Sequence, residues 1–207
     1  MMKETLFITL EGVEGAGKSS LMDYISELFT STGHEVIQTR EPGGTRTGEQ
    51  IREILLDSNN IGLESNTELL LMFAARMQHL EEVIKPALAS DQIVICDRFT
   101  DASYAYQGGG RGIQESRIQS LEDWVQEGLK PDITLLFDLD VEVGLRRAGK
   151  RSQADRFEQE DILFFERIRS CYLERAKKES SRFRIIHSGE SMENVKQQIQ
   201  NVLKKHL

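Results

Sequence analysis

The 207 residues suit one compact domain, long enough to bury about 70% of the surface that the unfolded chain exposes. The net charge of −8 argues against a surface built for nucleic-acid phosphates, because such binding depends on clustered Lys and Arg. The two cysteines lie too far apart for a zinc site or a disulfide framework, and no run approaches the roughly 20 apolar residues of a membrane span. We therefore expect a single cytoplasmic domain over 1–207, with no nucleic-acid or membrane partner.

Short β-type runs alternate with longer helical patterns along the chain. Strands are predicted at 5–10, 35–39, 92–96, 133–137 and 183–187, and helices at 19–30, 49–56, 66–89, 114–127 and 192–204. Pro86 falls near the end of the third helix, a position where proline ends or kinks a helix. This alternation predicts an α/β fold with a doubly wound, five-stranded parallel sheet flanked by helices, and with ligands beyond the carboxyl ends of the strands.

The first predicted strand runs into GVEGAGKS at 12–19, which fits G-x-x-x-x-G-K-[ST] without a gap. In such a phosphate loop, backbone N–H groups converge on phosphate oxygens, the lysine adds a point charge and the hydroxyl binds Mg²⁺. The alternative is a structural glycine turn. We expect a P-loop NTPase that binds ATP with Mg²⁺, with Lys18 catalytic and Ser19 a metal ligand. The residues expected to contact ATP are Gly12, Val13, Glu14, Gly15, Ala16, Gly17, Lys18, Ser19 and Ser20.

Asp97 and Arg98 directly follow the strand predicted at 92–96. The carboxylate suits a metal ion, bound directly or through water, and the guanidinium suits an acceptor phosphate, so both are candidate catalytic residues. The alternative is an ordinary surface turn. Asp138 and Asp140 end the next strand and are rival acids, but we interpret them as caps of the following helix.

Five cations gather around Gly149 in this acidic protein: Arg146, Arg147, Lys150, Arg151 and Arg156. A charge run is usually a solvated face. The alternative is a lid that closes over the triphosphate, excludes water and places a guanidinium on the transferring phosphoryl group. We predict a basic lid insertion at about 147–156.

The remaining candidates have simpler interpretations. The four histidines show no spacing typical of a metal or catalytic site, so most are expected at the surface or at strand ends. Cys96 lies on an apolar strand and is expected in the core. Met72 and Phe73 fall at helical spacing with Leu69 and Leu80, which favours packing.

Further motifs resemble the bacterial thymidylate (dTMP) kinases over nearly the whole chain. They are TREPGGT at 39–45, FAARMQH at 73–79, DRFTDASYAYQGGGRG at 97–112 and ADRFEQE at 154–160. The resemblance implies transfer of the γ-phosphoryl group of Mg·ATP to dTMP, giving dTDP and ADP for dTTP synthesis. It also implies a homodimer packed through long helices.

The resemblance assigns roles around the acceptor. Arg40 and Arg98 would hold its phosphate, Arg76 would hydrogen-bond the thymine, and Ser103 and Gln107 would lie along the base. Tyr106 would reject a ribose by a clash at the 2′ position, and Glu14 would accept a hydrogen bond from the 3′-hydroxyl. The family usually stacks thymine on a phenylalanine at the position of Met72, so either Met72 or Phe73 is expected to pack on the base.

The resemblance also bears on the catalytic cation. Some relatives carry arginine directly after the loop carboxylate, where this chain has Gly15. Arg151 matches the bacterial lid arginine, while Asp155 and Glu158 match the acidic residues that follow it, and Glu158 is a further candidate metal ligand.

Two alternatives to this assignment stay open. In the first, the phosphoryl acceptor is another monophosphate, such as UMP, or a nucleoside. A nucleotide-dependent switch is the other alternative, although the chain lacks an N-K-x-D guanine-reading element.

Overall fold

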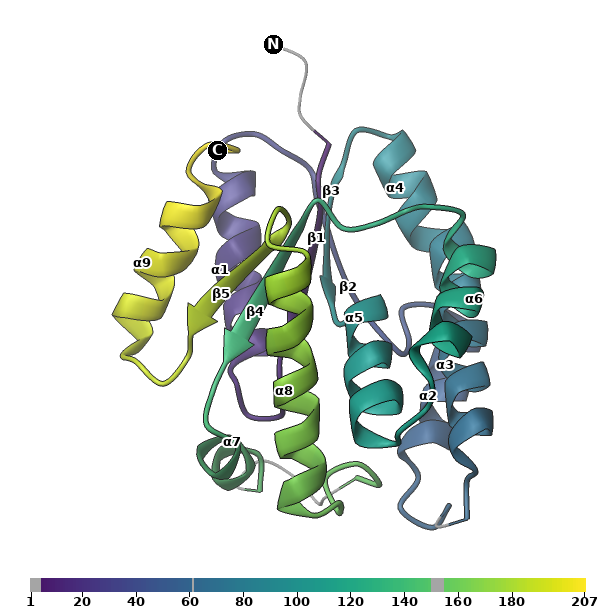
Figure 1. Ribbon diagram of the computed structural model, residues 1–207. Coiled ribbons are helices and arrows are strands. Elements are labelled where there is room, and N and C mark those ends of the chain that lie inside the picture. The colour runs from purple at the N-terminus through teal and green to yellow at the C-terminus, as the bar shows by residue number, and fades with distance from the viewer. Residues whose placement is uncertain (1–4, 61, 150–154) are drawn as a thin grey trace.

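The computed structural model describes residues 5–60, 62–149 and 155–207, so Arg151 and half of the predicted lid, residues 150–154, lie outside the described residues (Figure 1). The strands of the described ranges are β1 (Phe7–Glu11), β2 (Val36–Arg40), β3 (Ile93–Asp97), β4 (Ile133–Asp138) and β5 (Phe183–His187). The α-helices there are α1 (Lys18–Thr30), α2 (Arg46–Leu56), α3 (Ser65–His79), α4 (Lys85–Ala89), α5 (Thr100–Ser103), α6 (Glu115–Gln126), α7 (Val141–Ala148), α8 (Ile162–Lys178) and α9 (Met192–Leu203). Two π-helices, η1 (Leu80–Ile84) and η2 (Tyr104–Gly110), complete the described elements.

The described strands form one parallel sheet in the order β2-β3-β1-β4-β5, which confirms the predicted doubly wound fold. Strand β1 lies in the middle and is buried at all five positions, as its nearly continuous apolar run predicts. Leu10 is paired with Asp97 of β3, and Glu11 with Leu136 of β4. The carboxyl ends of these strands therefore meet at one edge, which is where ligands bind in such sheets.

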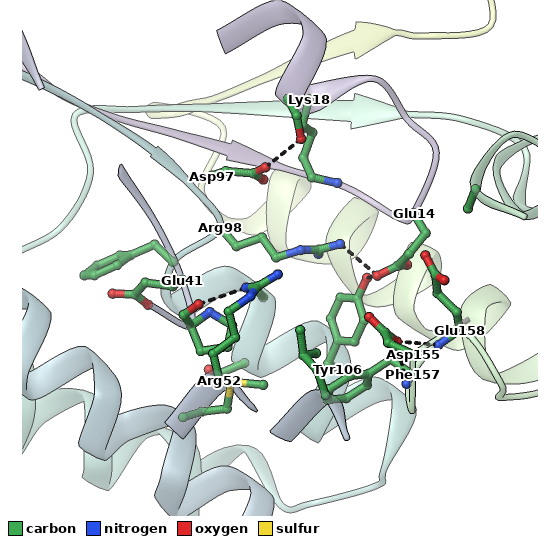
Figure 2. A pocket seen from close by; sticks show the side chains of 18 of the residues that line it. Glu14, Lys18, Glu41, Arg52, Asp97, Arg98, Tyr106, Asp155, Phe157 and Glu158 are labelled. Carbon is green, nitrogen blue, oxygen red and sulfur yellow. Dashed lines mark hydrogen bonds and ion pairs between the residues drawn. The ribbon is translucent and has the colours of Figure 1, made fainter. Parts of the chain in front are cut away.

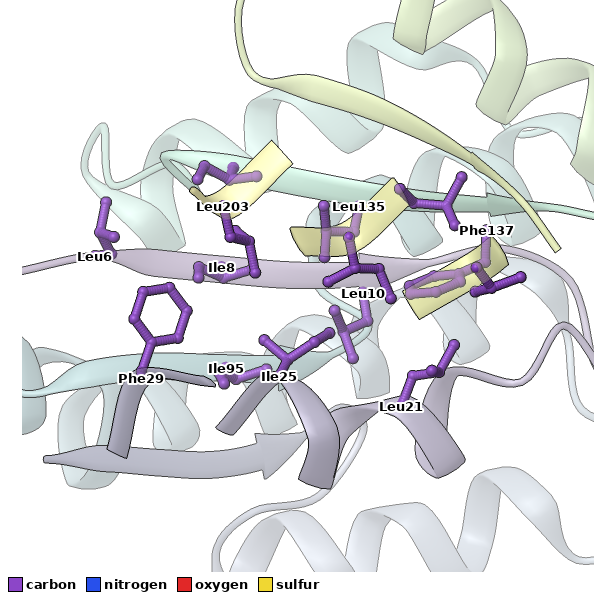
Figure 3. Close-up of a cluster of buried hydrophobic side chains, with 14 of the residues drawn as sticks. Leu6, Ile8, Leu10, Leu21, Ile25, Phe29, Ile95, Leu135, Phe137 and Leu203 are labelled. Carbon is purple, nitrogen blue, oxygen red and sulfur yellow. The ribbon is translucent and has the colours of Figure 1, made fainter. Parts of the chain in front are cut away.

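Alternate residues of β1 serve two different layers, because successive strand side chains point to opposite faces. Ile8 and Leu10 pack with Ile25 of α1 and Leu203 of α9 in the cluster of Figure 3. On the opposite face, Phe7 joins a second cluster with α3, η1 and α6, while α8 packs beside β4 and β5. Glu11 belongs to this opposite face, so a carboxyl group enters the buried layer beside α8.

Most predicted elements are confirmed, with boundaries within three residues of those predicted. The helix predicted at 66–89 is an unbroken run of α3, η1 and α4, in which Pro86 falls in the first turn of α4. The glycine-rich stretch at 107–112 is largely helical, because η2 extends to Gly110. A Cβ atom at Gly110 would lie 2.5 Å from the ring of Phe164, so η2 approaches α8 more closely than any side chain there permits. Among the helices of the described ranges, none combines the length and apolar character of a membrane span.

Candidate active site

A cavity of about 270 Å³ opens at the carboxyl edge of β1 and β3 (Figure 2). It brings together these predicted site residues: Glu14, Gly15, Gly17, Lys18, Ser19, Met72, Arg76, Asp97, Arg98, Ser103, Tyr106, Gln107 and Glu158. The predicted residues outside its lining are Gly12, Val13, Ala16, Ser20, Arg40 and Phe73. Val13 and Ala16 bury their side chains in the core, which leaves only the backbone of these two residues for contact with phosphate.

The phosphate loop has the geometry that its glycines predict. Gly17 has φ 94° and stands directly before α1, whose first residue is Lys18. No side chain caps this helix start, so its backbone N–H groups are available to an anion. The Lys18 Nζ donates to the carbonyl oxygens of Gly12 at 2.9 Å and Val13 at 3.0 Å. Burial, reinforced by the nearby Arg98, lowers the pKa of Lys18 to about 8.

Ser19 and Asp97 lie together at the base of the cavity. The Ser19 hydroxyl donates to Asp97 Oδ2 at 3.3 Å, while Asp97 Oδ1 is buried and has no hydrogen-bond partner among the described residues. A hydroxyl oxygen and an unsatisfied carboxylate oxygen are ligands that Mg²⁺ prefers. The described residues form no cluster of three or more His, Cys, Asp or Glu that could hold a metal ion.

Glu14 is directed away from the anion-binding N–H groups of its own loop. Its Oε1 accepts from Arg98 Nη2 at 2.9 Å, and its two carboxylate oxygens lie 2.6 and 2.7 Å from the Tyr106 hydroxyl that donates to them. The Arg98 guanidinium also lies over the Tyr106 ring, 4.7 Å from its centroid. Burial raises the pKa of Tyr106, so the phenol stays protonated as a donor. This triad joins the phosphate loop to the start of α5 and to η2.

Arg76 forms the inner wall of the cavity and is only 2% exposed. Its Nε donates to Glu41 at 2.7 Å, and its Nη2 donates to Ser103 Oγ and to the carbonyl oxygen of Phe99, both at 3.1 Å. Its Nη1 is buried with no hydrogen-bond partner in the described chain. A charged donor is therefore held rigidly at the wall with one N–H group unused. Phe73 lies beneath the guanidinium, 4.6 Å from ring centroid to Cζ.

Met72 and Phe73 have different environments, which separates the two candidates for contact with a base. Met72 lines the cavity, whereas Phe73 is 2% exposed and packs in the core around α3. The helix thus presents the thioether to the cavity and keeps the aromatic ring for packing.

Two expectations from the sequence are wrong in the described structure. Arg156 is not a lid cation: it is 9% exposed, donates to Glu68 at 2.6 Å and to the carbonyl oxygen of Leu55 at 2.8 Å. Asp138 is not a helix cap, because both its oxygens accept from Arg169, at 2.7 and 3.1 Å. Asp140 does cap α7, as predicted, by accepting from the N–H of Val143.

The expectation for the histidines holds for His34, His187 and His206, which all keep exposed surface, and His79 is the exception. His79 is fully buried, with Nδ1 3.0 Å from Glu41 Oε1 and Nε2 2.6 Å from Thr39 Oγ1. Glu41 therefore fixes both Arg76 and His79, and it also lines the cavity. The REPGGT motif, in which this carboxylate stands between Arg40 and a proline, was the available signal for it.

Two further predicted residues, Arg40 and Gln107, have partners within the protein, and the charged lining residue Arg52 was missed, like Glu41. Arg40 ends β2 outside the lining, with its side chain 54% exposed and its guanidinium paired with Glu49 at 2.8 Å. Gln107 lines the cavity and donates to the buried Glu68 at 2.9 Å. Arg52 was missed: it lines the cavity and donates to the carbonyl oxygen of Pro42, although the helical pattern of 49–56 carries no sign of this role.

Two phosphate-binding groups face the same cavity from different elements. The helix start at Lys18 suits a triphosphate, and Arg98, 80 residues further on, suits a second phosphate nearby. A parallel sheet with this loop and two adjoining anion sites defines a P-loop kinase of nucleoside phosphates.

Comparison with known proteins specifies the family. Residues 10–199 match the family model described as thymidylate kinase. The thymidylate kinase of Pseudomonas syringae pv. tomato DC3000 is 55% identical over 198 residues, covering 96% of this chain and 94% of the relative. The thymidylate kinase of Pseudomonas putida GB-1 is 54% identical over 198 residues, again covering 96% of this chain and 94% of the relative. The crystal structure of thymidylate kinase from Ehrlichia chaffeensis is 36% identical with a TM-score of 0.76, covering 96% of this chain and 98% of that one. The chain belongs to the thymidylate kinase family.

Proposed function

We propose that this protein transfers the γ-phosphoryl group of Mg·ATP to dTMP, giving dTDP and ADP in dTTP synthesis. A phosphate oxygen of dTMP forms the new bond to the γ-phosphorus, while the bond to the β,γ-bridging oxygen breaks and its electron pair stays on ADP. The observation that carries the proposal is the orientation of Glu14. Its carboxylate points away from the phosphate-binding N–H groups and bonds to Arg98 and Tyr106, so the same loop contacts both ATP and dTMP.

The donor half of the site consists of the phosphate loop, 12–20, and Asp97. The backbone N–H groups of the loop hold the triphosphate, and Lys18 exchanges its carbonyl partners for phosphate oxygens. Ser19 and Asp97 would hold Mg²⁺, Asp97 directly or through water, and Glu158 would be a further ligand from the cavity wall. The cation, when bound, neutralises the charge on the phosphates.

The acceptor half consists of residues from three other segments. Arg98 holds the dTMP phosphate, and Arg40 assists after leaving Glu49, an exposed pair that is worth less than about 1 kcal/mol. Glu14 accepts from the 3′-hydroxyl and Tyr106 crowds the 2′ position. The unused Nη1 of Arg76 supports a hydrogen bond to the thymine, since a buried unpaired donor is costly without a ligand.

The rest of the thymine pocket comes from α3, α5 and η2. Ser103 and Gln107 lie along the base, and Met72 packs against it. The burial of Phe73 supports Met72 over Phe73 for this contact.

The cation that stabilises the transferring phosphoryl group comes from the lid, about 147–156, with Arg151 as the candidate and Asp155 following it. Gly15 supports this assignment, because a Cβ atom there would lie 2.1 Å from the carbonyl oxygen of Gly144. No side chain fits at position 15, so the loop has no room for an arginine of its own.

The working enzyme is a cytoplasmic, single-domain protein that forms a homodimer through its long helices. Two exposed apolar side chains on neighbouring helices support this assembly: Leu70 of α3 is 56% exposed and Trp124 of α6 is 71% exposed. Light scattering after size exclusion tests the assembly. A monomeric mass for the unmodified protein, or a dimer unchanged in Trp124→Glu, would contradict this interface.

An acceptor panel tests the proposed reaction. ADP release is measured with dTMP, UMP, CMP, AMP and thymidine, and dTMP is expected to give the highest kcat/KM. Equal release with dTMP and thymidine would refute the proposal, and acceptor-independent hydrolysis would favour a nucleotide switch. Lys18→Ala and Arg98→Ala are expected to lower kcat/KM for dTMP by orders of magnitude, whereas Arg184→Ala, which changes an arginine bonded to local carbonyl oxygens, is the matched control. Arg151→Ala is expected to lower kcat more than it weakens ATP binding.

A further inference from the structure

Arg98 has an unusual backbone conformation. Its φ is +71°, in the left-handed region that residues with a side chain rarely adopt. Such a conformation persists only where the surrounding structure holds it in place, and it often marks a functional site. On one side, the N–H of Arg98 donates to the carbonyl oxygen of Leu10 at 3.0 Å. This bond fixes the peptide unit before Arg98, and the peptide unit after it needs a second attachment.

Glu11, the last residue of β1, supplies that second attachment. Its Oε1 accepts from the backbone N–H of Phe99 at 2.8 Å, directly after the left-handed residue. The side chain is fully buried on the α8 face of the sheet and does not line the cavity. Glu11 is therefore no substrate ligand, although it contacts the peptide unit that aims Arg98.

The second oxygen of Glu11 reaches the other end of Arg98 through Tyr172 of α8. Glu11 Oε2 accepts from the Tyr172 hydroxyl at 2.7 Å, and that hydroxyl oxygen lies 3.4 Å from Arg98 Nη1. Tyr172 is 1% exposed, so its position is fixed by packing. One carboxyl group thus contacts the backbone beside Arg98 and the hydroxyl beside its guanidinium.

We propose that Glu11 is a positioning residue for Arg98, which holds the left-handed turn through Phe99 and orients the guanidinium through Tyr172. The inference rests on the proposed role of Arg98 as ligand of the acceptor phosphate. The cost of burying this carboxyl group is consistent with a specific task. Desolvation, with a further contribution from Asp101, raises the pKa of Glu11 to about 8 against the opposing effects of Tyr172 and Arg98.

A purely structural role is the competing explanation, and the chain contains a matched pair that separates the two. Glu122 of α6 is also buried and accepts from a tyrosine hydroxyl, that of Tyr104, at 2.6 Å. Neither residue lines the cavity. Substitutions in this pair disturb a comparable hydrogen bond without touching Arg98.

The test measures steady-state kinetics for dTMP and ATP in the whole protein. Glu11→Met keeps the size of the side chain but removes both acceptors, and is expected to raise KM for dTMP and lower kcat/KM about 100-fold, as a displacement of about 1 Å does. The KM for ATP stays unchanged. Glu11→Gln is expected to restore activity to within several-fold, because its amide oxygen still accepts from Phe99. Tyr172→Phe shifts KM for dTMP in the same direction by a smaller factor.

The controls are Glu122→Met and Tyr104→Phe, which are expected to lower Tm and leave both KM values unchanged. A structural defect in Glu11→Met would reduce the fraction of folded enzyme, so a fall in kcat with unchanged KM for dTMP would overturn the inference. If Glu11→Met does not fold, Tyr172→Phe decides, and a KM for dTMP equal to that of the unmodified protein overturns it. Arg98→Ala is the reference. Normal kinetics in Arg98→Ala would remove Arg98 from the mechanism and would overturn the inference about Glu11 as well. If Arg98→Ala is defective but the Glu11 variants have normal kinetics, only the inference about Glu11 is overturned.

Discussion

Gly144 of α7 lies against the phosphate loop, and replacing it with alanine tests whether the loop position controls catalysis. A Cβ atom at Gly144 would lie 2.5 Å from the carbonyl oxygen of Glu14. Ordinary contact begins near 3.4 Å, so the loop or the helix must move by about 0.9 Å, the difference between the two distances. We expect part of this displacement to reach the Glu14 carboxylate, which pairs with Arg98 and Tyr106.

The stability cost of Gly144→Ala is expected to be small beside its kinetic effect. Overpacking costs about 1–3 kcal/mol, while alanine gains about 1 kcal/mol over glycine inside a helix. The net loss of about 0–2 kcal/mol lowers Tm by at most about 8 °C for a chain of this size. A misplacement of about 1 Å in a positioned group costs about 100-fold in rate, so kcat/KM for dTMP is expected to fall by that order.

The assay compares kcat/KM for dTMP and Tm in Gly144→Ala and Gly189→Ala. Gly189 is the matched control, because its Cβ would meet Leu139 at an unstrained 3.9 Å. Unchanged kinetics in Gly144→Ala, with a Tm near that of the unmodified protein, would show that the loop position tolerates the displacement. The reasoning would then be wrong.

Three other predictions concern buried charges. Because the pKa of Lys18 is lowered to about 8 and ATP phosphates favour its charged form, ATP binding is expected to take up a proton above pH 8 and to weaken as pH rises. Calorimetry in buffers of different ionisation enthalpy measures this uptake, and its persistence in Lys18→Met would contradict the assignment. Glu41→Gln breaks a buried ion pair and is expected to cost about 3–5 kcal/mol in the free energy of unfolding by urea. Glu49→Gln, which breaks an exposed pair, should cost under about 1 kcal/mol, and equal losses would refute the distinction. Arg156→Met leaves Glu68 buried with one fewer cation and is expected to lower Tm, whereas a Tm equal to the parent value would mean that Arg111 suffices.

The fold and the phosphate loop were predictable because their signals are local. The β1 strand is a continuous apolar run, and the loop that follows carries its motif within eight residues. Neither depends on contacts with distant segments. The order of the strands, β2-β3-β1-β4-β5, was not predicted and comes from the structure alone.

The residues that differ from their expected surface positions are charged or polar, and their partners are distant in the sequence. Arg156 is buried because Glu68, 88 residues away, accepts its charge. His79 is buried because Glu41, 38 residues away, and Thr39 satisfy both ring nitrogens. Sequence patterns assign such residues to the surface by default, since the pairing that permits burial is visible only in the folded chain.

The close approach of η2 to α8 at Gly110 means that a position far from the substrate can tolerate substitution less well than a position on the cavity wall. Tyr106 stands on η2 and Tyr172 on α8, and both contact Arg98 between them. The spacing of the two helices therefore sets the distance between Tyr106 and Tyr172, which lie on either side of the guanidinium. A side chain at Gly110 would increase the distance between η2 and α8, although position 110 touches no ligand. Met72 lies on the cavity wall, but its flexible side chain can be replaced by other apolar side chains at little cost. Variants of this enzyme should therefore accumulate more readily at Met72 than at Gly110.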